Sequence, residues 1–288
     1  MRLATILLQG QPRPAALADD QLIDLLSVDP GLPPSVRGLL GAGADALGAA
    51  QKAAANPKAR RIPVGQGSFL APIPDPEKIV CLGLNYSDHA RETGAAIPRE
   101  PILFSKYATA LTGHNCPIEI PSVSQEVDFE AELVIVVGKR GRHVAAANAY
   151  DCVAGYMVGH DVSARDWQLR KDGKQWMVGK TFDTFAPTGP FLVTRDEVAD
   201  ERNHAIRLRL NGEVMQDGTT ANLIFGVKEI IPYLSTVFTL EPGDLIFTGT
   251  PPGVGMARKP PRFMKAGDVA EVEIEGLGTL RNPVVQGK

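Results

Sequence analysis

The sequence predicts an α+β chain that is mostly β, because short apolar runs closed by turn residues outnumber helical stretches. The run 133–137 is β-branched and is closed by Gly138, and residues 207–214 alternate up to a turn at Asn211 and Gly212, a strong hairpin signal. Helical spacing is confined to a few segments, such as 145–150 and 227–234. The chain has 288 residues, 44% of them hydrophobic, which is enough for a large core.

Residues 1–72 differ in character from the rest and predict a small N-terminal α+β domain, followed by a larger β domain over 73–288. Residues 3–8 form a short apolar run typical of a strand. A helix is expected to begin at the capping residues Asp19 and Asp20, and a second one to run from Pro34 to about Ala55. The proline-rich stretch 71–76 marks the boundary.

Charge and cysteine usage limit the possible partners and compartments. The 30 basic and 33 acidic residues are spread along the chain, so no basic block predicts a nucleic-acid partner. The three cysteines, Cys81, Cys116 and Cys152, fit neither a disulfide framework nor a CxxC metal site. The apolar run 3–8 is too short for a signal peptide, and no run reaches the ~20 residues that span a bilayer. We therefore expect a cytoplasmic protein without membrane partners.

Acidic residues recur at every second position just before the buried run. Residues two apart share a face of a strand, so Glu126, Asp128, Glu130 and Glu132 would point the same way. Such a face can simply be solvated, and for an isolated pair that is the better interpretation. Because Glu132 leads directly into the apolar run, a carboxylate there is costly unless it is paired or binds a metal.

A second acidic candidate is Asp161, which follows the apolar run 153–159 at the exit of a predicted strand. A helix N-cap explains Asp161 equally well. Arg165 and Gln168 are three residues apart and would share a face of the helix that follows. Three carboxylates without a neighbouring cysteine favour Mg²⁺ or Mn²⁺ over zinc.

Three further segments contain candidate catalytic or binding residues. His89 and Glu92 would be neighbours on a helix, where the carboxylate could orient the imidazole as a general base; a surface histidine beside an incidental glutamate is the alternative. Lys180 lies among small and apolar residues and could stabilise an enolate, or its ammonium could reach solvent. The glycine-rich loop 247–255, which contains Thr250, does not fit the nucleotide fingerprints.

In combination, these segments resemble the fumarylacetoacetate hydrolase family, and in particular its longer, acylpyruvase-like bacterial members. The resemblance covers about residue 78 to the C-terminus. It rests on Asn85–Tyr86 with Asp88–His89 and Glu92, on Glu130 with Glu132, on the stretch 161–168, and on the stretches 180–189 and 240–255.

The resemblance implies a mixed β-roll or β-sandwich, a homodimer, and Mg²⁺ or Mn²⁺ held by Glu130, Glu132 and Asp161. It implies that a His89–Glu92 dyad lies on a mobile lid and that Lys180 is catalytic. It further implies substrate contacts from Tyr86, Arg165, Gln168 and Thr250.

The function implied is metal-dependent hydrolysis of a C–C bond in an acylpyruvate-like 2,4-dioxo acid, through a pyruvate enolate at the metal. Two alternatives share this chemistry: decarboxylation of oxaloacetate, and isomerisation or hydration of 2-hydroxydienoic acids from aromatic catabolism. A third alternative, a β-rich binding protein that merely tolerates calcium, leaves a His–Glu pair without a purpose.

Overall fold

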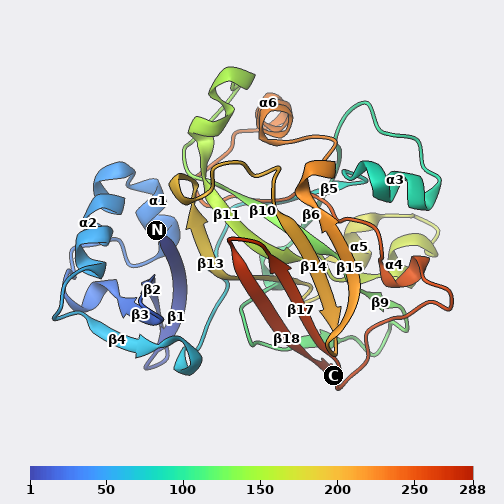
Figure 1. The fold of residues 1–288 in the computed structure, drawn as a ribbon. Helices are drawn as coiled ribbons and strands as arrows, with labels where there is room; N and C mark the ends of the chain where they lie inside the picture. The colour runs from blue at the N-terminus through green and yellow to red at the C-terminus, as the bar shows by residue number, and fades with distance from the viewer. Residues whose placement is uncertain (288) are drawn as a thin grey trace.

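The computed structural model describes residues 1–287 and is built around one long mixed sheet; Lys288, the end of the predicted second domain, lies outside the described residues. The strand order along the sheet is β4-β3-β2-β1-β13-β11-β10-β16-β5-β6, and β7 pairs with β13. Figure 1 shows the N-terminal strands (blue) at one end of this sheet and helices α3, α4 and α5 grouped on the other side of the molecule. The fold class is therefore α+β and mostly β, as predicted.

The centre of the sheet is buried on both faces because its strands are β-branched and apolar. In β10, Leu133 and Ile135 pack on one side in the core cluster shared with the second sheet, whereas Val134 and Val136 pack on the other side towards the N-terminal helices. The strands of this part are β10 (Ala131–Val137), β11 (Val153–His160), β13 (Ala186–Thr194), β16 (Leu245–Phe247), β5 (Ile79–Gly83), β6 (Ile102–Lys106) and β7 (Leu111–Thr112).

A five-stranded second sheet covers the long sheet, in the order β15-β14-β17-β18-β8. The predicted hairpin joins its first two strands, and Asn211 and Gly212 take the positive φ values of 54° and 82° that a tight hairpin turn needs. Its strands are β15 (Glu213–Thr219), β14 (Ala205–Leu210), β17 (Val269–Ile274), β18 (Gly278–Gln286) and β8 (Ile118–Ile120).

The N-terminal region extends the long sheet, because β1 pairs with β13. The helix expected after Asp20 is wrong: residues 21–24 form strand β3, and only a short 3₁₀ turn, Leu25–Ser27, follows. Pairing with β2 and β4 on both sides outweighs local helical spacing. The elements are β1 (Arg2–Leu8), β2 (Gln11–Ala18), β3 (Gln21–Asp24), β4 (Arg60–Pro63), α1 (Val36–Gly41) and α2 (Ala44–Ala54).

Two other helix predictions need correction. The single helix expected from Pro34 to about Ala55 is divided at Gly43, whose φ of 80° cannot continue a helix. The segment expected as a helix at 145–150 is a 3₁₀ helix, Ala146–Cys152.

No helix of residues 1–287 is long and apolar enough to cross a membrane; the helices and short strands not yet named complete the fold. They are α3 (Ser87–Thr93), α4 (Arg165–Leu169), α5 (Trp176–Lys180), α6 (Val227–Val237), β9 (Val127–Asp128) and β12 (Ser163–Ala164).

Candidate active site

The three predicted metal ligands converge at one end of β10 and β11. Glu132 is the second residue of β10, Glu130 lies just before that strand, and Asp161 follows β11. Antiparallel register places Ala131 opposite His160, and the Asp161 N–H donates to the Glu130 carbonyl at 3.0 Å. One carboxylate oxygen from each residue lies within 4.8 Å of the others.

The predicted acidic strand face, however, is wrong. Residues 126–132 are not one strand: β9 pairs with β12, and β10 begins only at Ala131. Before the break, Asp128 accepts hydrogen bonds from the backbone N–H groups of Gly255 at 2.7 Å and Met256 at 3.0 Å. Asp128 thus anchors the glycine-rich loop and is not part of the metal-binding group.

Buried cations neutralise most of the triad. Lys180 Nζ lies 2.9 Å from both Glu130 Oε2 and Asp161 Oδ2, and Arg165 Nη2 lies 2.7 Å from Glu130 Oε1. Burial alone would raise the pKa of Glu130, but Lys180 and Arg165 outweigh it and lower that pKa to about 2. Burial opposes the charge of Lys180 as well, yet Asp161 and Glu130 raise its pKa. Lys180 is 3% exposed, so the alternative of a solvent-seeking lysine is wrong.

Glu132 is the carboxylate whose charge is not balanced. It is 1% exposed and accepts a hydrogen bond from Gly249 N–H at 2.8 Å, but it forms no ion pair within residues 1–287. Burial, followed by repulsion from Asp161 and Glu130, raises its pKa well above the usual value. A buried oxygen of Asp161, Oδ1, also lacks a hydrogen-bond donor in this described part, although Lys106 Nζ lies 2.7 Å away as an ion-pair partner. Three converging oxygens with one uncompensated charge fit a hard divalent cation.

The predicted dyad forms on α3. His89 Nδ1 lies 2.9 Å from Glu92 Oε2, and the other Glu92 oxygen accepts a hydrogen bond from Gly253 N–H at 3.0 Å. The dyad is more exposed than the triad, with side chains 12% and 28% accessible. His89 is also close enough to Glu130 to contribute to the lowering of its pKa. The loop that binds Glu92 through Gly253 N–H also binds Glu132 through Gly249 N–H, so the more exposed dyad borders the buried carboxylate group.

The predicted substrate-binding residues differ in how many of their hydrogen-bonding groups already have a partner within the protein. Arg165 already uses each guanidinium nitrogen: Nε binds Asp128, Nη2 binds Glu130, and Nη1 donates to Gln168 Oε1 at 2.9 Å. As placed, Arg165 organises carboxylates, and its contact with a substrate stays a prediction.

The hydroxyl groups of Tyr86 and Thr250 differ in whether a protein group already forms a hydrogen bond with them. The Tyr86 hydroxyl is buried without a hydrogen-bond partner in the described part of the chain, and burial, followed by Glu132, raises its pKa. This hydroxyl therefore has an unused donor near Glu132. Thr250 Oγ1 instead accepts a hydrogen bond from Gln216 Nε2 at 2.8 Å.

Sequence reasoning missed Lys106 and Gln216. Lys106 is 3% exposed, forms an ion pair with Asp161, and donates to the carbonyls of Phe185 at 2.8 Å and Lys180. Its only signal was a lysine at the end of a short strand that begins with three apolar residues. Gln216 gave no signal, because an amide in an alternating hairpin is typical of an exposed face.

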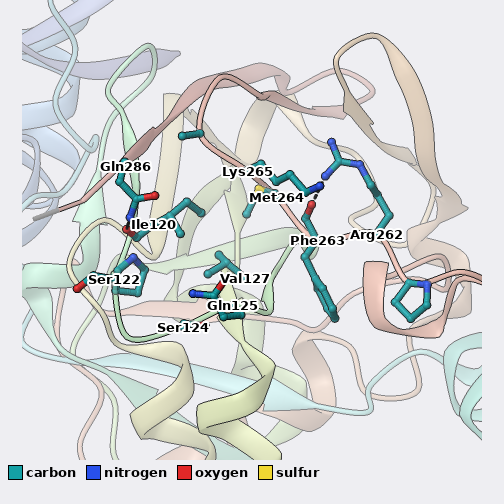
Figure 2. A pocket seen from close by; sticks show the side chains of 13 residues that line it. Ile120, Ser122, Ser124, Gln125, Val127, Arg262, Phe263, Met264, Lys265 and Gln286 are labelled. Carbon is teal, nitrogen blue, oxygen red and sulfur yellow. Dashed lines mark hydrogen bonds between the residues drawn. The ribbon is translucent and has the colours of Figure 1, made fainter.

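A separate hollow of about 570 Å³ lies at the surface, lined by residues of the segments 120–127 and 261–266 together with Gln286. Figure 2 shows side chains from both segments around it, among them Arg262, Lys265 and Phe263. None of the predicted site residues lines this hollow, so it is distinct from the carboxylate group.

The fold and the site together define a β-rich protein with a buried oxygen-donor centre bordered by a His–Glu pair. Residues 78–285 match the family described as Fumarylacetoacetate (FAA) hydrolase C-terminal. The chain belongs to the fumarylacetoacetate hydrolase family and is an enzyme of that family.

Similar proteins carry three different activities in their names. "Oxaloacetate tautomerase fahd2, mitochondrial" from Xenopus laevis is 50% identical over 264 residues, which cover 92% of this chain and 82% of that protein. The crystal structure of 5-carboxymethyl-2-hydroxymuconate delta-isomerase from Mycobacterium smegmatis is similar with a TM-score of 0.78 at 35% identity, over all of both chains. Maleylpyruvate hydrolase from Sphingobium sp. SYK-6, in complex with manganese(II) and pyruvate, gives a TM-score of 0.84 at 31% identity, again over all of both chains.

The close approach of Gly255 to Asp128 predicts that a side chain at position 255 would destabilise the protein. A Cβ at Gly255 would overlap the Arg262 carbonyl oxygen and lie 2.5 Å from Asp128 Oδ1, whereas one at Gly48 in α2 meets nothing within 4 Å. We expect Gly255→Ala to lower the free energy of unfolding by ~1–3 kcal/mol through overpacking. The control Gly48→Ala should raise it by up to ~1 kcal/mol, because alanine is the better helix former. Denaturant unfolding measures both, and equal values for the two variants would contradict the packing argument.

Proposed function

We propose that this chain is a divalent-metal-dependent enzyme that interconverts the keto and enol forms of oxaloacetate. The observation that carries the proposal is the buried triad with Lys180 between two of its members, bordered by the His89–Glu92 pair. Enolisation needs positive charge where the enolate oxygen develops and a group that moves a proton on the adjacent carbon. Oxaloacetate as substrate is supported by the name of the relative that is 50% identical to this chain.

The residues that would hold the metal are Glu130, Glu132 and Asp161, and a bound ion would supply Lewis-acid polarisation of the 2-oxo group. The manganese(II) complex of the similar hydrolase supports a divalent ion. Lys180 keeps a fixed positive charge beside this position, and Arg165 holds Glu130 ionised and oriented.

The dyad would move the proton. A Glu92 carboxylate that accepts from Nδ1 leaves the lone pair on His89 Nε2, which can take a proton from C3 of oxaloacetate and return it to the oxygen. The second Glu92 oxygen is held by Gly253 N–H, so the imidazole is oriented through the loop.

A second candidate is hydrolysis of a C–C bond in an acylpyruvate-like 2,4-dioxo acid. The specific observation in its favour is the same dyad, since a histidine held by a carboxylate can equally remove a proton from water. The name of the similar maleylpyruvate hydrolase supports this candidate.

One assay separates these reactions. The purified chain would be given enol oxaloacetate, keto oxaloacetate and a panel of acylpyruvates, with Mg²⁺, Mn²⁺ or a chelator, while enol absorbance, pyruvate and CO₂ are followed. Metal-dependent loss of the enol without pyruvate supports the tautomerase. Pyruvate from an acylpyruvate supports the hydrolase, and pyruvate with CO₂ from oxaloacetate the decarboxylase. Enol loss that is unchanged by chelator contradicts the metal-dependent proposal.

Removal of the buried Lys180 cation should separate catalysis from stability. We expect Lys180→Met to lower kcat/KM by ~10²–10³-fold, the usual effect of losing one preorganised electrostatic group. Lys78→Met is the matched control, because Lys78 pairs at 2.9 Å with the buried Asp244 at the opposite end of β10. If both variants lose activity equally, Lys180 acts through stability alone.

The homodimer, the cytoplasmic location and the separate domain over 1–72 stay predictions. Size-exclusion chromatography with light scattering tests the first of these directly.

A further inference from the structure

Gln216 lies on β15, the edge strand of the second sheet, yet its side chain is only 1% exposed. In the pairing of β14 with β15, Leu208 faces Gln216 and Arg209 faces Val214, so Met215 is an extra, bulged residue. In a regular strand Met215 and Gln216 would point to opposite faces, but here both are buried. The bulge redirects the Gln216 amide into the protein.

The amide of Gln216 joins two parts of the site. Its Oε1 accepts a hydrogen bond from the N–H of Ala131 at 2.8 Å, and Ala131 stands between the ligands Glu130 and Glu132. Its Nε2 donates to Thr250 Oγ1 and to the Pro251 carbonyl, both at 2.8 Å. One half of the amide therefore holds the ligand-bearing strand, and the other half holds the glycine-rich loop.

That loop in turn holds the dyad. Gly253 N–H donates to Glu92 Oε1 at 3.0 Å, only two residues after Pro251. The loop lies tightly against β15: a Cβ at Gly253 would overlap the Met215 carbonyl, and one at Gly218 would lie 2.7 Å from Pro251 Cβ. The loop cannot move along β15 without breaking the bonds of Gln216.

From this continuous set of contacts we infer that Gln216 is a positioning residue that fixes the His89–Glu92 dyad relative to the carboxylate triad. The expected effect on turnover rests on the proposed function. The statement that Gln216 joins the ligand-bearing strand to the loop rests on these contacts alone. Within residues 1–287, the Gln216 side chain forms no hydrogen bond with the triad side chains or with the dyad, so it acts through Ala131 on one side and through Thr250 and Pro251 on the other.

The two halves of the amide can be separated by substitution. Gln216→Glu keeps an acceptor for Ala131 but loses the donor to Pro251. The variant therefore loses the hydrogen bond to the loop and keeps the one to the ligand-bearing strand. Gln216→Met loses both halves. For Gln216→Glu we expect kcat to fall by ~10–100-fold with KM and Mn²⁺ affinity changed by less than ~3-fold; Gln216→Met should also lose ~10-fold in Mn²⁺ affinity.

Asn282→Asp is the matched control. Asn282 on β18 is also 1% exposed, and its Nδ2 donates to the carbonyls of Gly113 and Cys116, both at 2.8 Å. The change removes a buried amide donor from two carbonyls of the loop between β7 and β8, on a different strand of the second sheet from Gln216. It should lower stability as Gln216→Glu does, and leave kcat and Mn²⁺ affinity unchanged.

A readout independent of activity is hydrogen–deuterium exchange of the intact, metal-free chain. We expect Gln216→Glu to accelerate exchange in peptides that cover 249–255 and 87–92, and Asn282→Asp to leave both unchanged. Unchanged exchange in Gln216→Glu, or the same acceleration in Asn282→Asp, overturns the inference. A further outcome separates the inference from the proposed function. If exchange accelerates in Gln216→Glu alone, but the wild-type protein turns over none of the tested substrates, the inference is supported and the proposed function is refuted.

Discussion

Glu130→Gln should reduce metal-dependent turnover by at least ~10³-fold, since a metal contributes several kcal/mol of charge stabilisation and each 1.36 kcal/mol is a factor of ten. Glu130 is held ionised by Lys180 and Arg165, and its oxygens lie with those of Glu132 and Asp161. A neutral amide of the same shape removes the charge that a divalent cation needs. It also leaves two buried cations facing an amide. Calorimetric Mn²⁺ titration and turnover at saturating metal measure the loss.

Glu201→Gln is the control for this change. Glu201 is likewise buried, at 3% exposed, and accepts hydrogen bonds from the Tyr150 hydroxyl at 2.9 and 3.0 Å, outside the site. It should lose some stability and keep its metal affinity. If Glu130→Gln binds Mn²⁺ as tightly as the wild-type protein does, the three carboxylates are not the metal site.

His89→Ala is expected to lower kcat by ~10²–10⁴-fold, the usual contribution of a positioned general base. Metal affinity should be retained, because the histidine borders the triad and is not one of its three converging oxygen donors. The measurement is turnover of enol oxaloacetate and of an acylpyruvate across pH, with Mn²⁺ affinity measured in parallel.

Two companion variants sharpen this test. Glu92→Gln should give a smaller loss, because His89 remains but its orientation by the carboxylate is weakened. His143→Asn removes an exposed histidine and should have no effect. A His89→Ala enzyme that tautomerises normally but no longer hydrolyses would restrict the dyad to the hydrolytic reaction.

The closest agreement between sequence and structure lies where local chemistry and burial demand the same arrangement. The β-branched run of β10 predicted a buried strand, and Asn211 with Gly212 predicted a tight turn; both predictions are confirmed. His89 and Glu92 meet because three residues apart on a helix are neighbours. Oxaloacetate was among the alternative substrates expected from the sequence, as the substrate of a decarboxylase, and it also appears in the name of a relative that is 50% identical to this chain, there as the substrate of a tautomerase.

Other features depended on distant parts of the chain. Residues 21–24 became a strand because β2 and β4 flank them. The acidic series 126–132 was divided because Asp128 finds its partners at Arg165, Gly255 and Met256, up to 128 residues away. Spacing along the chain carries no information about such partners.

By itself, then, the sequence determined which residue types could bind a cation and move a proton, because charge, hydrogen-bonding groups and short-range periodicity are local properties. The tertiary structure alone decided which carboxylate lacks a compensating charge, that Lys106 supports Asp161, and that Gln216 joins the ligand strand to the loop. A buried ion or amide needs a hydrogen-bonding or charged partner, because water is excluded. That partner can come from any part of the chain, so only the tertiary structure identifies it.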